Sequence, residues 1–224
     1  MKTARALLVT ALVLLSPPTH ARAQTGTPPA TPPAAAAPDH GSLDGNAYTN
    51  DYFGLTLTLP EGWKVQGEAV RERNREAGRR LFDTKDPAAR ARLEKAVGNT
   101  LNLLTAYQYR VGAAVHFNPA FLCAAEKIPE AAAGATEADY MDVLKQTFRH
   151  SQAPITIDRD VYTEQVGGET FYALDITTRF PNAIGHQRYY TRIRRGYALS
   201  LVLTYLTDEQ LRTLEGVVNS VRFR

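Results

Sequence analysis

The sequence has a single cysteine, Cys123, among its 224 residues. An intrachain disulfide is therefore excluded, so the fold must be held by an apolar core, and a chain of this length can bury one. Apolar residues flank Cys123 from Phe121 to Ala125, and no cation adjoins the thiol. We expect a buried structural residue, with a reactive thiol as the less favoured alternative. Cys123 also does not follow the N-terminal apolar run, so it is not the acylated cysteine of a bacterial lipoprotein.

An excess of one charge is also missing once the first residues are set aside. The chain has 26 Lys and Arg against 23 Asp and Glu, and Lys2, Arg5 and Arg22 account for the difference of three. The rest of the chain is therefore neutral. A neutral chain has no global field that attracts phosphate backbones. We expect no nucleic-acid partner and no membrane-surface binding through net charge.

Sequence motifs of hydrolysis, phosphate binding and metal binding are missing as well. The sequence has no G-x-S-x-G, no G-x-G-x-x-G, no C-x-x-C and no H-x-x-x-H. The histidines after the first 23 residues lie far apart, at His40, His116, His150 and His186. We therefore expect that the protein is not an enzyme and that it holds neither a metal ion nor another cofactor.

Asp158 and Asp160 are the nearest approach to a catalytic pair. They lie two residues apart on an expected strand, so both should project from one face. Paired carboxylates perform acid–base chemistry when burial separates their pKa values. Because Thr156, Tyr162 and Glu164 share that face, we interpret it as solvated.

A long apolar run is missing, but a short one is present near the start. Residues 6–15 are mostly apolar and too few to span a bilayer. Lys2 and Arg5 precede the run, and Ala21-Arg22-Ala23 follows it. This pattern is typical of a signal peptide over residues 1–23, with Gln24 as the mature N-terminus. We expect an exported protein, periplasmic or extracellular, that is soluble and is not a lipoprotein.

Residues 24–46 are rich in Pro, Ala and Thr and have almost nothing to bury. This composition predicts a disordered or polyproline-like linker. Order is expected to begin near Tyr48, and residues 47–224 are expected to form a single domain. The chain is thus divided into a signal peptide, a linker and one folded domain.

Alternation of apolar and polar residues predicts strands at 52–59, 63–65, 101–109, 113–117, 121–128, 155–163, 171–179, 187–195 and 197–205. The segments 113–117 and 121–128 are alternatively one strand broken at Asn118-Pro119. One face of the strand at 101–109 is expected to hold Leu101, Leu103, Thr105, Tyr107 and Tyr109, and one face of the last strand Tyr197, Leu199, Leu201, Leu203 and Tyr205.

Spacing and caps predict helices at 68–80, 86–97, 136–150 and 207–221. The last two are expected to begin at capping boxes, Thr136 with Asp139 and Thr207 with Gln210. The helix at 136–150 is expected to bury one stripe, namely Tyr140, Met141, Leu144 and Phe148. Gly167-Gly168 is expected to turn a hairpin, which makes the last strands a β-meander. Antiparallel hairpins with helices covering the sheet define an α+β fold with a central antiparallel sheet.

Both ends of residues 47–224 carry a family resemblance. Tyr48-Thr49-Asn50, Phe53-Gly54-Leu55 and Leu59-Pro60-x-Gly62-Trp63 resemble the opening of the PsbP-like superfamily, which includes PsbP and DcrB-like envelope proteins. Residues 196–199, the last helix and residues 220–223 resemble its closing motif. The resemblance implies a central antiparallel sheet flanked by helices and a non-catalytic role of binding or stabilising partners. It carries over no site residues, because the sequence has no matching site motif.

The strongest candidate binding residues share one face of the strand at 187–195 by alternation: Arg188, Tyr190, Arg192 and Arg194. Three cations with an aromatic ring between them can grip a carboxylate, a phosphate or an acidic partner. The favoured alternative is a solvent face whose charges are balanced by acids on a neighbouring strand, namely Asp158, Asp160 and Glu164.

Three functions follow from these observations, in order of preference. The first is a secreted or periplasmic non-enzymatic accessory or binding module, whose partner is an envelope protein. The second is a carrier of a small apolar or amphipathic ligand in a cavity between sheet and helices. The third is a hydrolase whose site combines Asp158, Asp160 and a histidine from distant parts of the chain.

Overall fold

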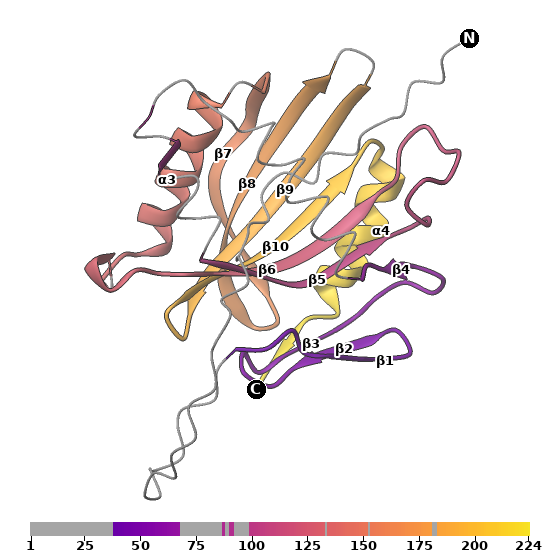
Figure 1. Cartoon of the computed structure of the whole chain (residues 1–224), viewed down its shortest axis with the longest axis horizontal. Coiled ribbons are helices and arrows are strands. Elements are labelled where there is room, and N and C mark those ends of the chain that lie inside the picture. Colours follow the sequence, from indigo (N-terminus) through magenta and orange to yellow (C-terminus); the bar gives the residue numbers. More distant parts are fainter. Residues whose placement is uncertain are drawn as a thin grey trace, which may run out of the picture.

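The computed structural model describes residues 38–67, 87, 90–91, 99–132, 134–151, 153–180 and 183–224. The predicted signal peptide, most of the predicted linker and the predicted helix at 68–80 lie outside these residues. Of the predicted helix at 86–97, Pro87, Arg90 and Ala91 are described, and all three are helical. Two antiparallel sheets and the helices α3 and α4 make up the described part of the chain (Figure 1).

The large sheet has the strand order β4-β5-β6-β10-β9-β8-β7, and each neighbouring pair is antiparallel. Its strands are β4 (Lys64–Val65), β5 (Thr100–Tyr107), β6 (Ala120–Lys127), β7 (Ile155–Val166), β8 (Glu169–Phe180), β9 (Ala183–Arg194) and β10 (Tyr197–Tyr205). Strands β7 to β10 form the predicted meander. Gly167 and Gly168 turn the first hairpin with φ of 61° and 83°, values that favour glycine.

The small sheet begins earlier in the chain than expected. Its order is β1-β2-β3-β11, with β1 (Ser42–Asp44), β2 (Ala47–Asn50), β3 (Leu55–Thr58) and β11 (Arg222–Phe223). Strand β1 falls inside the predicted linker at 24–46. A two-residue turn at Gly45-Asn46 pairs Asp44 with Ala47 and makes β1 and β2 a hairpin. The Gly45-Asn46 pair is the sequence feature that could have predicted this hairpin. The residues of β1 are exposed, so they show no apolar pattern typical of a strand.

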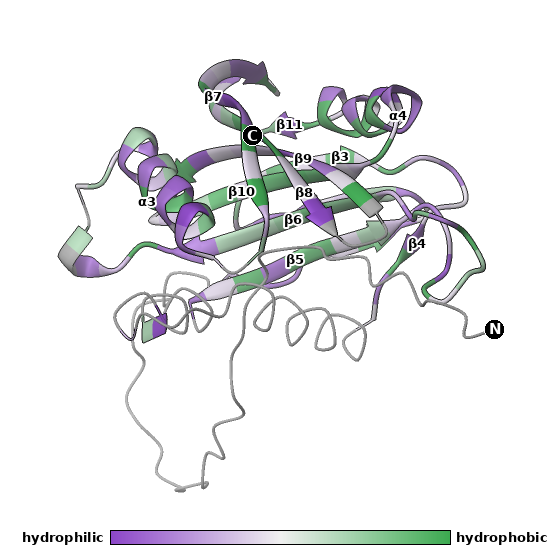
Figure 2. Cartoon of the chain, turned by 90° about the horizontal axis from the view of Figure 1, so that it is seen from above, coloured by the Kyte–Doolittle hydropathy of each residue, from purple (hydrophilic) through white to green (hydrophobic). Residues whose placement is uncertain are grey.

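Each helix begins at a predicted capping box. Thr136 and Asp139 cap α3 (Glu137–His150), and Thr207 and Gln210 cap α4 (Asp208–Asn219). The helices cover opposite faces of the large sheet (Figure 2). A single 3-10 turn, η1 (Glu130–Ala132), precedes α3.

The sheet separates two apolar cores. On the α3 side, Met141, Leu144 and Phe148 of the predicted helix stripe pack against β6, β8, β9 and β10. On the other side, α4 and the small sheet pack on a core that includes the predicted β10 face, Tyr197, Leu199, Leu201, Leu203 and Tyr205. Cys123 is fully buried in this second core, and burial raises the pKa of its thiol, as expected of a structural residue. The α+β prediction is confirmed.

Two sequence predictions for the strands are wrong. The register of β5 shifts between Asn102 and Leu104, so Leu101 and Thr105 do not share the predicted face. The predicted strand at 113–117 is irregular, because the Ala113 N–H donates to the Arg110 carbonyl over 3.0 Å and closes a turn. No helix in the described part of the chain is both long and apolar enough to cross a membrane.

Candidate functional site

Strand β9 places the four predicted binding residues, Arg188, Tyr190, Arg192 and Arg194, on the face that α4 and the small sheet partly cover. The shared face is the one that alternation predicts. Their surroundings differ along the strand. Arg188 lies near α4, whereas Arg194 reaches the small sheet.

Arg188 is held between two carboxylates. Its Nε donates to Asp175 Oδ1 over 2.9 Å, one Nη donates to Asp175 Oδ2 over 3.2 Å, and the other donates to Glu215 Oε1 over 2.8 Å. The side chains of Arg188 and Asp175 are 15% and 14% exposed. Burial works against the charge of Arg188, but the bonds to Asp175 raise its pKa above the usual value, so it stays charged. This forked pair fixes β8, β9 and α4 at one point.

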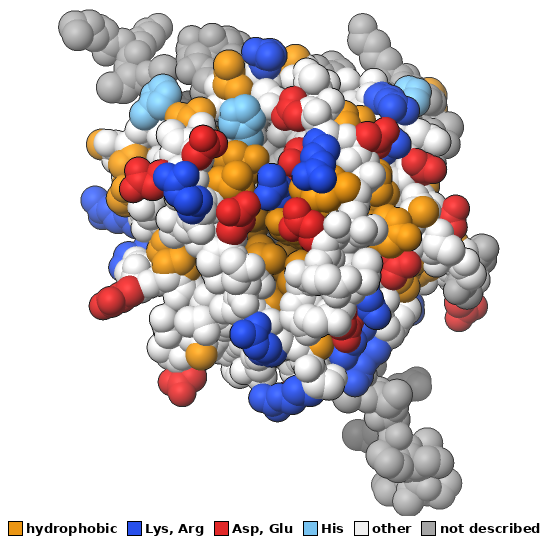
Figure 3. All heavy atoms as spheres, turned by 180° about the vertical axis from the view of Figure 1, so that it is seen from behind, with side chains coloured by type: hydrophobic (Ala, Val, Ile, Leu, Met, Phe, Trp, Pro, Cys, Tyr) orange, Lys and Arg blue, Asp and Glu red, His pale blue; other side chains and the backbone are white. Residues whose placement is uncertain are grey.

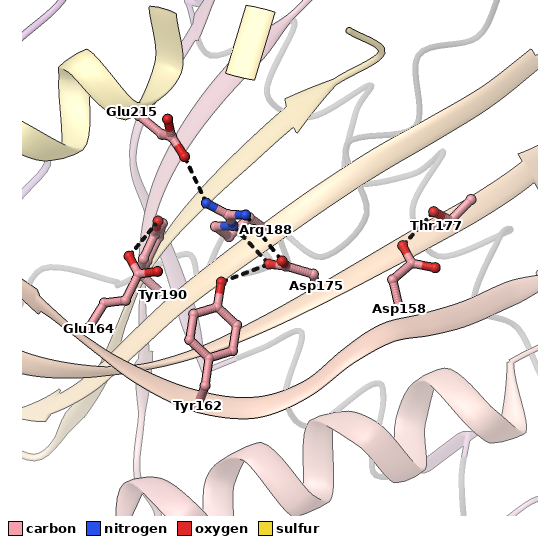
Figure 4. A network of polar contacts seen from close by, with 8 residues as sticks. All are labelled: Asp158, Tyr162, Glu164, Asp175, Thr177, Arg188, Tyr190 and Glu215. Atoms are coloured by element: carbon pink, nitrogen blue, oxygen red, sulfur yellow. Dashed lines mark hydrogen bonds and ion pairs between the residues drawn. The ribbon is translucent and has the colours of Figure 1, made fainter. Parts of the chain in front are cut away.

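Two tyrosines, Tyr162 and Tyr190, extend the network around Arg188 (Figure 4). Tyr162 Oη donates to Asp175 Oδ1 over 3.0 Å, and Tyr190 Oη donates to Glu164 Oε2 over 3.1 Å. Burial raises the pKa of both phenols, so they remain hydrogen-bond donors at neutral pH. The tyrosines thus orient one oxygen of Asp175 and one oxygen of Glu164.

A second series of hydrogen bonds joins β7, β8 and β9. The hydroxyl of Thr177, a buried residue, donates to Asp158 Oδ2, and His186 Nδ1 lies 2.8 Å from the same hydroxyl. Since the one hydroxyl proton is used toward Asp158, the Nδ1–H of His186 donates to Thr177. The ring of His186 stacks on Tyr205 at a centroid distance of 5.5 Å. Asp158 and a histidine are therefore brought together, as the hydrolase hypothesis requires.

The prediction that Asp158 and Asp160 share one face is wrong. The register of β7 shifts between Ile157 and Arg159 and again before Tyr162. Asp158 consequently contacts β8, whereas Asp160 Oδ1 lies 2.8 Å from Lys145 Nζ on α3. The hydrogen bond from Lys145 lowers the pKa of Asp160. The two carboxylates face different elements and do not form an acid–base pair.

Different acids from those expected balance the arginines of β9. Of Asp158, Asp160 and Glu164, only Glu164 contacts the predicted set, through Tyr190. The charges are balanced instead by Asp175, Glu215 and Glu169.

Arg192 and Arg194 fasten the far end of β9. Arg192 Nε lies 2.6 Å from Glu169 Oε2, and Arg194 bonds the other oxygen of Glu169 over 2.9 Å. Arg194 also donates to the carbonyls of Phe53, over 2.7 Å, and of Arg224, over 2.9 Å. These bonds hold the small sheet and the last residue against the large sheet.

Four carboxylates lie along the network of Figure 4. Asp175 and Glu215 accept from Arg188, Glu164 accepts from Tyr190 and Asp158 accepts from Thr177. The guanidinium of Arg159 lies 3.5 Å from the centre of the Tyr162 ring. We call these four carboxylates, together with Tyr162, the acidic face. Figure 3 shows the α4 side of the molecule, where charged side chains of both signs border a hollow with an apolar floor.

Sequence reasoning missed Asp175, Glu215 and Tyr162. The sequence held a usable signal for the first two. Asp175 continues the inward alternation of Phe171 and Ala173 on β8, and Glu215 lies four residues after Leu211 on the buried stripe of α4. A carboxylate on an otherwise apolar face indicates a buried partner. Within the described residues, no three His, Cys, Asp or Glu side chains gather in a way that holds a metal ion.

A second polar pair lies on the α3 side of the sheet. Tyr140 Oη of α3 donates to Glu126 Oε2 of β6 over 2.8 Å. The pair borders a cavity of about 20 Å³ between α3 and the sheet, whose lining includes Thr100, Leu144 and Ser200. This volume fits about one water molecule and is far too small for an organic ligand.

Burial raises the pKa of Glu126 above its usual value. A raised folded-state pKa means that stability is present at low pH and is lost as the carboxyl ionises. We expect Glu126→Gln to raise the free energy of unfolding by about 1 kcal/mol near pH 8 and to have little effect near pH 4. Urea denaturation at both pH values measures this difference. An equal effect at the two values would assign the change to packing and not to the charge.

No protein-family model matches the chain, and no curated protein matches it. Several solved structures are similar in outline. PsbP from Synechocystis is 13% identical, with a TM-score of 0.46 over 82% of this chain and 98% of that one. LpqN of Mycobacterium tuberculosis, involved in cell envelope biogenesis, is 12% identical, with a TM-score of 0.42 over 83% and 88%. The T6SS immunity protein TplEi of Pseudomonas aeruginosa is 12% identical, with a TM-score of 0.33 over 80% and 74%. These likenesses are ones of outline, at low sequence identity.

Proposed function

We propose that the chain is an exported, non-enzymatic binding module that acts in the periplasm or outside the cell. Its binding surface is the acidic face, and its partner is a protein segment rich in Lys and Arg. The observation that carries this proposal is a network of four carboxylates in which Arg188 pairs with two, Asp175 and Glu215, while Asp158 and Glu164 accept from uncharged hydroxyl groups (Figure 4).

Charge and geometry both favour a cationic partner. The carboxylate of Asp175 is paired with Arg188 and is largely buried. Asp158 is exposed and the side chain of Glu215 is 36% exposed, so the carboxylates of Asp158 and Glu215 reach solvent. The Tyr162 ring already carries the guanidinium of Arg159 in a cation–π contact within the chain. A partner cation adds ion pairs of the same type without displacing the internal ones.

The predicted binding residues have supporting roles in this proposal. Arg188 and Tyr190 position the carboxylates of Asp175 and Glu164, and Arg192 and Arg194 secure the end of β9. Because their guanidinium groups already have acidic partners, they are less suited to gripping an anion than the sequence pattern indicates.

The alternatives have weaker support from the described residues. The carrier needs an enclosed cavity between the sheet and a helix, and the cavity between α3 and the sheet is about 20 Å³, too small for an organic ligand. The hydrolase needs a hydroxyl whose proton passes to a histidine, but the Thr177 hydroxyl donates to Asp158 and the residue is 4% exposed, so it is not placed as a nucleophile.

Titration with a hexa-arginine peptide tests the proposal. We expect saturable binding that weakens with salt, and about fivefold weaker binding for Glu215→Gln and for Asp158→Asn, since each removes one exposed carboxylate contact. The matched control is Asp142→Asn, which removes the same charge from the exposed surface of α3. If all three variants bind alike, the peptide recognises net charge and the acidic face is not the site. If the chain binds hexa-glutamate and not hexa-arginine, the arginines of β9 are the binding residues, as the sequence pattern predicts.

A further inference from the structure

A groove lies where the free edges of the two sheets meet. Within the described residues, β1 is one of the two outer strands of the small sheet and β4 is one of the two outer strands of the large sheet. A groove of about 430 Å³ is lined by the β1–β2 turn and by the turn at residues 60–62 that leads into β4. Its apolar lining consists of Leu43, Leu59, Pro60, Trp63 and Val65.

Apolar side chains on this groove face solvent. Leu43 is 42% exposed and Val65 is 36% exposed, while Trp63 is partly buried against the main core. The groove therefore presents an indole and two aliphatic side chains beside unpaired strand edges. Aromatic-lined grooves of this kind take proline-rich segments in the polyproline II conformation.

The chain carries a segment of that chemistry directly before β1. Residues 27–38 read Thr-Pro-Pro-Ala-Thr-Pro-Pro-Ala-Ala-Ala-Ala-Pro and contain no charge. Prolines at this density favour polyproline II, which is extended and loses little entropy on binding. The segment is thus matched to the apolar lining of the groove, in which Glu61 is the one charged residue among those described, whereas the acidic face favours a basic partner.

The point where the segment joins the fold lies within reach of the groove. The Asp39 carbonyl accepts from Asn50 Nδ2 over 3.0 Å, and the His40 carbonyl accepts from Tyr48 Oη over 2.9 Å. These hydrogen bonds hold residues 39 and 40 just before the start of β1. The groove begins at the other end of β1, beside Gly45. Three strand residues cover about 10 Å. Eleven residues of polyproline II cover about 34 Å, so residues 27–37 can fold back along β1.

We propose that residues 27–37 of the same chain dock in this groove as a polyproline II segment, with prolines against Trp63. Docking covers Leu43 and Val65 and shields the edge of β1 that no described strand pairs with, an edge of the kind that invites pairing with another chain. This docking is independent of the acidic face and of its partner.

Trp63 is the only tryptophan of the chain, so its fluorescence reports on the groove directly. The test compares residues 24–224 with a variant in which Pro28, Pro29, Pro32 and Pro33 are replaced by serine. We expect the variant to show red-shifted emission and about twofold stronger quenching by acrylamide, because the indole loses an apolar cover. A free peptide of residues 27–37 is expected to reverse both changes.

The control variant replaces Ala34, Ala35, Ala36 and Ala37 with serine, which keeps the prolines and the length of the segment. It is expected to keep the emission of the unchanged chain. Equal emission and quenching in all three chains would overturn the proposal. Quenching of the unchanged chain that rises on dilution would also overturn it, since a segment from a second copy would then occupy the groove.

Discussion

Replacement of Asp175 by alanine is expected to lower the free energy of unfolding by about 3 kcal/mol. Asp175 accepts two bonds from Arg188 and one from Tyr162, and its side chain is 14% exposed. Without it, Arg188 keeps only Glu215 as a carboxylate partner, and the Tyr162 hydroxyl loses its acceptor. Removing one member of a buried pair leaves an uncompensated charge, which costs more than the pair contributes.

The double variant Asp175→Leu/Arg188→Met separates charge from packing. Both charges leave together, so we expect it to recover most of the stability lost in Asp175→Ala, although Tyr162 still lacks its acceptor. Denaturant midpoints at constant m-value give the comparison. A double variant no more stable than Asp175→Ala would mean that the loss comes from packing and not from an unpaired guanidinium.

The C-terminal third of the fold was predictable because its signals are local. Alternation at 197–205 and the Thr207–Gln210 capping box need only neighbouring residues, and both appear in the structure as predicted. The apolar stripe of α4 follows from the same local spacing. Core elements of this kind do not depend on how distant strands align.

β-Bulges are the reason that the predicted side-chain faces of β5 and β7 are wrong. A single extra residue sends every later side chain to the opposite face, and the alternation pattern does not mark where it occurs. The shifts at Asn102 in β5 and at Arg159 in β7 therefore overturned the expected faces. The supposed Asp158–Asp160 pair was lost for this reason alone.

The acidic face could not be assembled from the sequence for a related reason. Asp175 and Glu215 lie 13 and 27 residues from Arg188 along the chain. Their contacts depend on the register of β8 against β9 and on where α4 returns to the sheet. Sequence alternation placed Arg188 on the correct face, but only the tertiary arrangement identified its partners.

Phe53 joins the two sheets, and its truncation is expected to have an effect as large as that of Asp175. The side chain is fully buried, and its ring lies edge-on to Tyr52 at 4.8 Å and to Tyr197 of β10 at 5.5 Å. It lies in the turn between β2 and β3, so it anchors the small sheet on the large one. Phe53→Ala is expected to cost about 3–5 kcal/mol through lost burial and the cavity that remains.

Two further variants make this expectation specific to packing. Phe53→Leu keeps an apolar side chain and is expected to cost about 1.5 kcal/mol. Val143→Ala truncates a side chain that is 57% exposed on α3 and should change stability by less than about 0.5 kcal/mol. The backbone bond from Arg194 to the Phe53 carbonyl persists in every variant. If Phe53→Ala loses no more than Val143→Ala, the small sheet is held by Arg194 and the other polar contacts, and the aromatic cluster is not its anchor.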